Sequence, residues 1–266
     1  MNRTRERVVR LSDGAETLVE QWGERGPLLV GVHGLGASRR GWARIGEHFA
    51  GRYRVVAYDQ RGHGDSAHVR DLRFARTVRD AVEVAAAFGE PVRALLGHSW
   101  GGAIAVGAGR EAPVERVAVF DPMLFGAENV WRDSVMVQYR NLLAPPAEER
   151  ERAIRAENAA LPEVEIEAKL HAGRRITLEA IAALGEDNAI DAGGWNFRHL
   201  LRDYPKPLLI AVAGLKRSVF LAEDRAYAAE AGGPNVCVEV FEGASHSLQR
   251  DAFERVMPVV EAFLEG

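Results

Sequence analysis

Residues 92–106 read VRALLGHSWGGAIAV and decide the fold. An apolar run too short for a helix is followed by a glycine-bracketed serine and then by an alanine-rich helical pattern, which predicts strand, abrupt turn and helix. A serine at such a turn projects its hydroxyl beyond the strand, and Gly97 and Gly101 let strand and helix approach closely. We therefore predict that Ser99 is a nucleophile. A turn with only a structural role is the alternative.

Apolar runs of strand length recur on both sides of this stretch. Helical patterns separate most of them, and a chain that alternates strands with helices forms a mostly parallel sheet with helices on both faces. The sequence therefore predicts the α/β class. The runs outside the central stretch are residues 28–32, 54–58, 117–120, 207–213 and 236–241.

Two segments depart from this alternation, one near the N-terminus and one in the second half of the chain. Residues 8–11 and 17–22 flank Ser12-Asp13-Gly14, which is the composition of a hairpin with a tight turn. Residues 123–204 are helical in pattern and contain no strand-like run, so we predict an all-helical cap. The α/β core then consists of residues 1–122 and 205–266.

The predicted cap leaves the core at the carboxyl ends of the strands. Ligands of parallel sheets bind beyond these ends, so the cap should lie above Ser99. Its aromatic side chains are expected either to line an apolar substrate pocket or to form the cap's own core. These side chains are Phe125, Trp131, Tyr139, Trp195 and Phe197.

Composition narrows the classes of partner. The chain has 266 residues and a net charge of −4, which gives no electrostatic basis for binding nucleic acid or an anionic membrane. It has no signal-peptide pattern and no apolar run of about eighteen residues, so we expect a cytoplasmic protein with a small-molecule substrate. Cys237, the only cysteine, excludes an intrachain disulfide and lies in a Val-Cys-Val run typical of a buried strand thiol. The oligomeric state stays open.

A serine hydroxyl is a weak nucleophile until a base takes its proton. Of the eight histidines, His33 and His63 lie in glycine-rich turns, where histidines usually form backbone hydrogen bonds. His246 follows the last strand and precedes the last helix. The small residues 243–245 leave room for its ring to reach across the sheet end, so we predict His246 as the general base.

Four motifs in this order resemble the α/β-hydrolase superfamily. They are His-Gly at residues 33–34, DxRGxGxS at 59–66, GHSWGG at 97–102, and a late Gly-x-x-His that ends at His246. Their order and spacing match the family over essentially the whole chain. The resemblance implies the family's sheet with a lid inserted between its sixth and seventh strands.

The resemblance also implies functional residues. It assigns Ser99 as nucleophile and His246 as base, and it implies an oxyanion hole made by the backbone N–H groups of Leu35 and Trp100. In this family the segment at residues 59–66 is chiefly a structural loop. The resemblance does not imply a substrate.

The third member of the triad departs from the usual pattern. Most relatives place the acid three residues after the glycine that ends the seventh strand, and counting from Gly214 gives Arg217, which cannot accept the imidazole proton. Some members take the acid from the end of the strand that follows the nucleophile helix, where this chain has Asp121. We predict Asp121. One alternative is that Asp224 or Glu223 is the acid. The other is that Asp121 is structural and the chain has no functional acid.

These residues predict a serine hydrolase that cleaves a carboxylic ester or lactone of a small to medium apolar substrate through an acyl-enzyme. No cofactor or metal is expected, since the histidines lack paired ligand spacing. Epoxide hydrolases and haloalkane dehalogenases carry an aspartate at the position of Ser99, which disfavours both. A hydrolase of C–C bonds with the same triad, or a non-catalytic small-molecule receptor on the same scaffold, remains an alternative.

Overall fold

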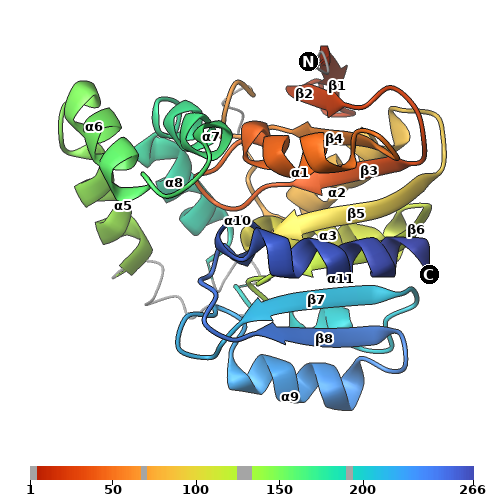
Figure 1. The fold of residues 1–266 in the computed structure, drawn as a ribbon. Helices are drawn as coiled ribbons and strands as arrows, with labels where there is room; N and C mark the ends of the chain where they lie inside the picture. The colour runs from red at the N-terminus through yellow and green to blue at the C-terminus, as the bar shows by residue number, and fades with distance from the viewer. Residues whose placement is uncertain (1–4, 67–70, 125–133, 190–193) are drawn as a thin grey trace.

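One eight-stranded sheet forms the centre of the computed structural model, which describes residues 5–66, 71–124, 134–189 and 194–266. The strands are β1 (Arg5–Arg10), β2 (Glu16–Trp22), β3 (Leu28–Val32), β4 (Arg54–Tyr58), β5 (Val92–His98), β6 (Val114–Phe120), β7 (Leu208–Ala213) and β8 (Val236–Phe241). Their order across the sheet is β1-β2-β4-β3-β5-β6-β7-β8 (Figure 1). The six strands from β3 to β8 run parallel to one another, so the predicted α/β class is confirmed.

The N-terminal hairpin is also present. β1 pairs with β2 in antiparallel register, and β2 continues the sheet by pairing antiparallel with β4. The Leu11 N–H donates to the Ala15 carbonyl at 2.8 Å, and Gly14 in this turn has φ +85°, a conformation that favours glycine. The turn therefore lies at the predicted Ser12-Asp13-Gly14.

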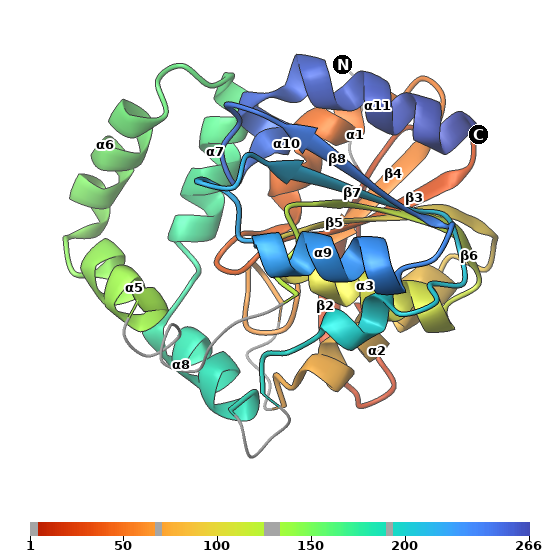
Figure 2. The same ribbon diagram turned by 90° about the horizontal axis from the view of Figure 1, so that it is seen from below.

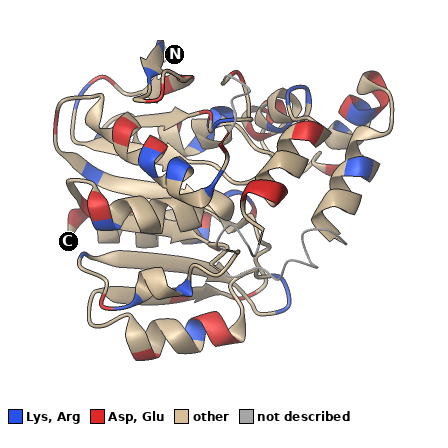
Figure 3. Ribbon diagram, turned by 180° about the vertical axis from the view of Figure 1, so that it is seen from behind, with Lys and Arg blue, Asp and Glu red and all other residues tan. Residues whose placement is uncertain are grey.

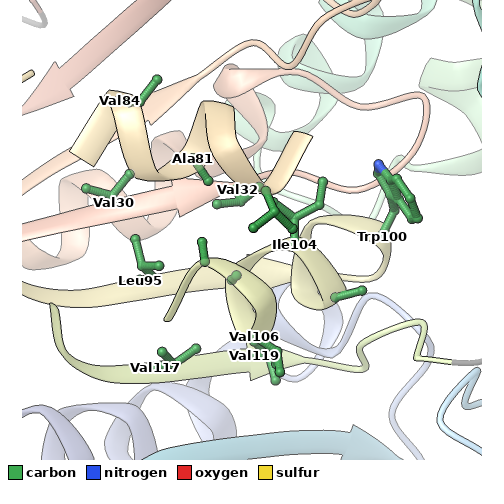
Figure 4. Packing of buried hydrophobic residues seen from close by; sticks show 14 of the residues in the cluster. Val30, Val32, Ala81, Val84, Leu95, Trp100, Ile104, Val106, Val117 and Val119 are labelled. Carbon is green, nitrogen blue, oxygen red and sulfur yellow. The ribbon is translucent and has the colours of Figure 1, made fainter. Parts of the chain in front are cut away.

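Helices cover both faces of the sheet. They are α1 (Ala43–Phe49) and α11 (Phe253–Glu265) on one face, and α2 (Phe74–Ala86), α3 (Trp100–Glu111) and α9 (Ala222–Ala231) on the other (Figure 2). Successive strand side chains point to opposite faces, so Leu95 packs with α2 and α3, whereas Leu96 packs on the side of α1 and α11. Burial on both faces explains the uninterrupted apolar runs of the sequence. Figure 4 shows Ile104 and Val106 of α3 among the strand valines, with Trp100 at the end of this cluster.

The regular elements described between β6 and β7 are helices, joined by turns and loops. These helices are α5 (Met136–Leu143), α6 (Ala147–Glu157), α7 (Glu163–Gly173), α8 (Leu178–Asp187) and the short helix η4 (Arg198–Leu201). Figure 1 shows α5 to α8 beyond the arrowheads of β5, β7 and β8, the side on which the carboxyl ends of these strands lie. We call α5 to α8 the helical insertion. The division of the chain into core and cap at residues 123 and 204 stays a prediction.

The helical insertion contacts the core unevenly. α7 has six buried residues, including Glu165 and His171, whereas α5 and α6 contain no buried residue. His171 Nδ1 lies 3.0 Å from the Ser38 hydroxyl, and its Nε2 lies 3.1 Å from the Asp65 carboxylate. Polar contacts thus tie α7 to the loops that follow β3 and β4.

Two details of the sequence reading are corrected. Cys237 is exposed, because β8 is an edge strand whose cover is incomplete. In the sequence, Val135, Tyr139 and Leu142 recur at helical spacing and predict one apolar face of a helix. In the structure Leu142 is 43% exposed, and Leu143 is the residue that packs partly against the core. Both errors arise because periodicity shows that a side is apolar but not how completely a neighbour covers it.

Charged residues of both signs are interspersed on the surface helices, and no face of one sign is visible in Figure 3. This arrangement agrees with the small net charge of −4. Within the described ranges, no helix combines the length and the apolar character that crossing a membrane requires.

Candidate active site

Ser99 occupies the predicted turn between β5 and α3. Its φ of 55° and ψ of −121° lie outside the regions that side chains prefer, and such a conformation costs about 1–3 kcal/mol. The turn is tight enough that a Cβ on Gly97 would lie 2.4 Å from the Gly101 carbonyl oxygen, and a Cβ on Gly101 would lie 2.2 Å from that of His33. Strand, turn and helix are therefore confirmed, and both bracketing glycines are required by close backbone contacts.

His246 and Asp121 form a hydrogen-bonded pair. His246 lies between β8 and α10 (Leu248–Asp251), and its Nδ1 is 2.6 Å from Asp121 Oδ2. The Asp121 side chain is fully buried, whereas that of His246 is 33% exposed. Because a carboxylate accepts, Nδ1 carries the proton in this pair and Nε2 keeps a lone pair.

Hydrogen bonds fix both the backbone and the carboxylate of Asp121. It follows β6 directly with φ +45°, and its N–H donates to the Ala211 carbonyl at 2.7 Å. The Ser218 hydroxyl and the Ala213 N–H donate to Oδ1, and the Val219 N–H donates to Oδ2 at 2.9 Å. A carboxylate with this many donors is fixed in position, which orients the imidazole.

The roles of Ser218 and Val219 are not apparent from the sequence. They lie in the segment after β7, where the family pattern places the acid, and the structure shows that this segment here supplies donors to an acid from β6. The sequence feature that could indicate this role is the serine next to Arg217. Arg217 is exposed, and its side chain approaches the Gly243 carbonyl at 3.5 Å.

The alternative acids lie elsewhere. Asp224 is fully buried, but its carboxylate pairs with the Arg198 guanidinium and accepts the Leu221 N–H at 2.7 Å at the start of α9. Glu223 is exposed on the same helix. Of the three candidate carboxylates, Asp121 is the one that the structure brings to His246.

His98, directly before the predicted nucleophile, contacts the histidine loop. Its Nε2 lies 3.0 Å from the His246 carbonyl oxygen, and the two rings are 4.8 Å apart. Burial lowers the pKa of His98 well below its usual value, and the nearby His246 and Arg250 side chains lower this pKa further. A neutral His98 therefore donates from Nε2 and fixes the backbone that carries His246, a role that the sequence reading missed.

The predicted oxyanion donors lie on two loops that meet beside Ser99. A Cβ on Gly34 would lie 3.2 Å from the Ser99 Cβ, which shows how closely the turn after β3 approaches the serine. In the part of the chain that the structure describes, neither the Leu35 nor the Trp100 backbone N–H has a hydrogen-bond partner. Free N–H groups of this kind can bind a negatively charged oxygen.

The aromatic residues predicted to line a pocket have different positions. Trp195 is buried and its ring lies 5.2 Å from that of Trp100, next to Phe197. Tyr139 of α5 reaches the turn after β3, where its hydroxyl donates to the Leu35 carbonyl at 3.2 Å. The other two, Phe125 and Trp131, lie outside the described residues, and the pocket itself stays a prediction.

The neighbouring motifs have the structural roles that were expected. His33 Nδ1 lies 2.8 Å from the Gly34 carbonyl, and its Nε2 accepts the Gln60 N–H at 3.1 Å. Burial lowers the pKa of His33 to about 4, so this ring is neutral near pH 7. The Asp59 carboxylate accepts the Arg39 and Asp65 backbone N–H groups at 2.7 and 2.8 Å, which fixes the loop after β4.

Two further features of the site concern the serine hydroxyl and metal ligands. Over the described ranges, the Ser99 hydroxyl makes no hydrogen bond to His246. Such bonds are often long without substrate and shorten in the reacting complex. In the same ranges, no group of three or more His, Cys, Asp and Glu side chains is arranged to hold a metal ion.

Comparison with known proteins places these features in context. The model of the alpha/beta hydrolase family matches residues 29–259. The magnesium-chelatase 30 kDa subunit of Rhodobacter capsulatus is 33% identical over 46% of this chain and 43% of its own length. For epoxide hydrolase 4 of Mus musculus, the identity is 37% over 31% of this chain and 24% of that enzyme. The chain thus spans less than half the length of these two relatives.

Two solved structures resemble the whole chain. The crystal structure of E-2-(acetamidomethylene)succinate hydrolase has a TM-score of 0.82 at 18% identity and covers 99% of this chain and 100% of its own. Est816, described as an N-acyl homoserine lactone degrading enzyme, has a TM-score of 0.74 at 19% identity, with 97% and 100% covered. At such low identity these similarities show the shared fold.

Proposed function

Because the chain belongs to the alpha/beta hydrolase family, we propose that it is a serine-dependent hydrolase of a carboxylic ester or lactone with a small to medium apolar acyl or alcohol portion. The observation that carries this proposal is the His246–Asp121 pair at 2.6 Å, on the sheet edge where the Ser99 turn lies. An imidazole oriented by a buried carboxylate is the arrangement that activates a serine hydroxyl.

In the first step the Ser99 oxygen attacks the carbonyl carbon of the ester while His246 Nε2 takes the hydroxyl proton. Asp121 holds the imidazole through Nδ1–H and stabilises the positive charge that forms on the ring. The carbonyl oxygen becomes an oxyanion, which the Leu35 and Trp100 N–H groups stabilise. Loss of one such donor typically lowers turnover by about 10²- to 10³-fold.

The tetrahedral intermediate then collapses. The C–O bond to the alcohol breaks, His246 returns its proton to the leaving oxygen, and the acyl group remains on Ser99. In the second step His246 takes a proton from water, the hydroxide attacks the acyl carbon, and Ser99 leaves as the protonated hydroxyl. The product is the carboxylic acid, or the hydroxy acid where the substrate is a lactone.

The apolar character of the substrate is inferred from aromatic residues near the site. Trp100, which directly follows Ser99, forms a cluster of rings with Trp195 and Phe197. Tyr139 contacts Leu35 in the turn after β3. The lactone part of the proposal is supported by the likeness to Est816, whose description names a lactone. The aspartate nucleophile of epoxide hydrolases is replaced here by Ser99, so the partial match to epoxide hydrolase 4 does not extend to its chemistry.

The test uses the whole chain and graded substrates. Purified protein is incubated with p-nitrophenyl esters of increasing acyl length, with an N-acyl homoserine lactone and with an epoxide, and separately with a serine-directed phosphonate. We expect turnover of an ester or the lactone and a single phosphonate adduct on Ser99. Ser99→Ala should lose the adduct and at least about 10⁴-fold in turnover.

The matched control is Ser134→Ala, an exposed serine just before α5, which should leave turnover and labelling unchanged. Labelling of Ser99 without turnover of any ester or lactone would favour the C–C bond hydrolase. The absence of both labelling and turnover would favour the receptor and contradict the proposed function. Turnover of the epoxide by the Ser99→Ala variant would contradict the role of the serine.

A further inference from the structure

Tyr139 connects the helical insertion to the turn that carries one oxyanion donor. It lies on α5, and its hydroxyl donates to the Leu35 carbonyl at 3.2 Å across 104 positions of sequence. The contact with the next residue is as close, because a Cβ on Gly36 would lie 1.9 Å from the Tyr139 hydroxyl oxygen. The tyrosine therefore sits directly on the Leu35–Gly36 peptide.

The turn at this place has a defined type. The Ala37 N–H donates to the Gly34 carbonyl at 3.1 Å, so Leu35 and Gly36 are its two central residues. Gly36 has φ +66°, whereas Leu35 is not among the residues with positive φ, and this combination is a type II turn. In types I and II the central peptide points in opposite directions, so the position of the Leu35 carbonyl distinguishes them.

We propose that Tyr139 is a positioning residue that holds this turn in the type II form and thereby keeps the Leu35 N–H directed at the oxyanion. The inference rests on the proposed function for its catalytic consequence. The hydrogen bond to the Leu35 carbonyl fixes the central peptide, and the Leu35 N–H belongs to the peptide next to it. Rotation of the central peptide changes the backbone angle at Leu35 and would disturb the donor.

The chemical state of Tyr139 suits this role. Burial raises the pKa of its phenol to about 12, so the hydroxyl keeps its proton and remains a donor across the range in which proteins are active. A donor is required, because a carbonyl oxygen can only accept. No other residue of α5 makes a hydrogen bond to this turn within the described part of the chain.

The contact also couples two parts of the molecule. α5 has no fully buried residue, and its residues Met136 and Leu143, like Val135 just before it, pack only partly against the core. The hydroxyl of Tyr139 reaches the turn only when α5 is seated on the core. The oxyanion donor is therefore complete in the seated arrangement, and separation of α5 would release the turn.

The test is Tyr139→Phe, which keeps the ring and removes the donor, against Tyr227→Phe on α9 as the matched control. One hydrogen bond corresponds to a loss of about two- to tenfold in kcat with p-nitrophenyl esters. Because the effect acts through the oxyanion, the loss should be the same for every acyl length, should leave KM unchanged, and should recur in the rate of phosphonate labelling. A change in KM that grows with acyl length would instead make Tyr139 a substrate contact and overturn the inference.

A second measurement does not depend on activity. Amide hydrogen exchange over residues 34–37 should be faster in Tyr139→Phe than in the wild type, and unchanged in Tyr227→Phe. Equal exchange in the wild type and Tyr139→Phe would overturn the inference even if the enzyme is active. An inactive wild type with the expected exchange difference would instead contradict the proposed function while the structural part of the inference stands.

Discussion

Asp121 and Asp224 are both fully buried carboxylates close to the end of a strand or the start of a helix, yet they have different partners. Asp121 binds His246, which is one-third exposed and whose ring lies 4.8 Å from that of His98, the residue before Ser99. Asp224 binds the Arg198 guanidinium and the first turn of α9. Burial and hydrogen bonding alone therefore do not identify a catalytic acid in this chain; the identity of the partner does.

The difference follows from where each residue lies relative to the sheet. β6 pairs with β5, and the Ser99 N–H donates to the Phe120 carbonyl at 3.0 Å, so the residue after Phe120 is necessarily close to the Ser99 turn. Asp224 instead follows a loop and lies on a helix that covers one face of the sheet. An acid at the end of β6 is thus next to Ser99 through backbone pairing, whereas one on α9 is available to stabilise the helix.

The largest effect is expected for Asp121→Asn. The amide cannot accept the imidazole proton in the same way, and loss of the orienting carboxylate typically lowers kcat by about 10⁴-fold in serine hydrolases. Ester turnover and urea unfolding are measured together. A variant that folds and retains near-normal kcat would remove Asp121 from the triad and break the comparison.

Asp224→Asn should show the opposite profile. Removing one partner of a buried ion pair typically costs about 3 kcal/mol or more in the free energy of unfolding, and partial exposure of Arg198 reduces this value here to about 2–3 kcal/mol. Turnover of the folded fraction should stay within about threefold of the wild type. A large loss of kcat without a loss of stability would transfer the role of acid to Asp224.

Ser218→Ala tests whether the donors around Asp121 matter to catalysis. The variant removes a hydrogen bond to the carboxylate and leaves the His246 contact in place, so a charge-assisted bond of about 1.5–3 kcal/mol is lost from the support of the pair. We expect kcat to fall by about tenfold, since part of the lost energy is recovered by relaxation, and KM to stay unchanged. Unchanged kcat would show that the Val219 and Ala213 N–H groups suffice to hold Asp121.

The smallest effect is expected for Glu223→Gln, the exposed neighbour of Asp224. Its charge in the first turn of α9 interacts favourably with the helix dipole, which is worth less than about 1 kcal/mol at an exposed site. The midpoint of urea unfolding should shift slightly, and kcat should remain within about twofold. Any larger loss of turnover would reopen the choice among the three carboxylates.

Much of the fold follows from local sequence. The serine turn, the helix that follows it, the hairpin and the parallel strands lie where apolar runs, glycines and helical spacing predict them. The errors concern exposure: Cys237 lies on an edge strand, and Leu142 faces away from the core. Local patterns predict which element forms and which side is apolar, but the degree of cover depends on distant neighbours.

The candidate site divides in the same way. Motifs and chain position predict Ser99 and His246, and their catalytic roles stay predictions. The pairing of Asp121 with His246, the donors from Ser218 and Val219, the His98 contact and the Tyr139 bond to Leu35 required the structure. Each of these contacts joins segments that are far apart in the chain, so no local spacing predicts it.

The sequence by itself determined that a strand, a strained serine turn and a helix would form within a mostly parallel sheet, because apolar periodicity and glycine act over a few residues. Only the tertiary structure decided which buried carboxylate contacts His246 and which residue of the helical insertion contacts the turn after β3. The reason is that these choices depend on strand order and on how helices cover the sheet. Both are properties of segments brought together by folding.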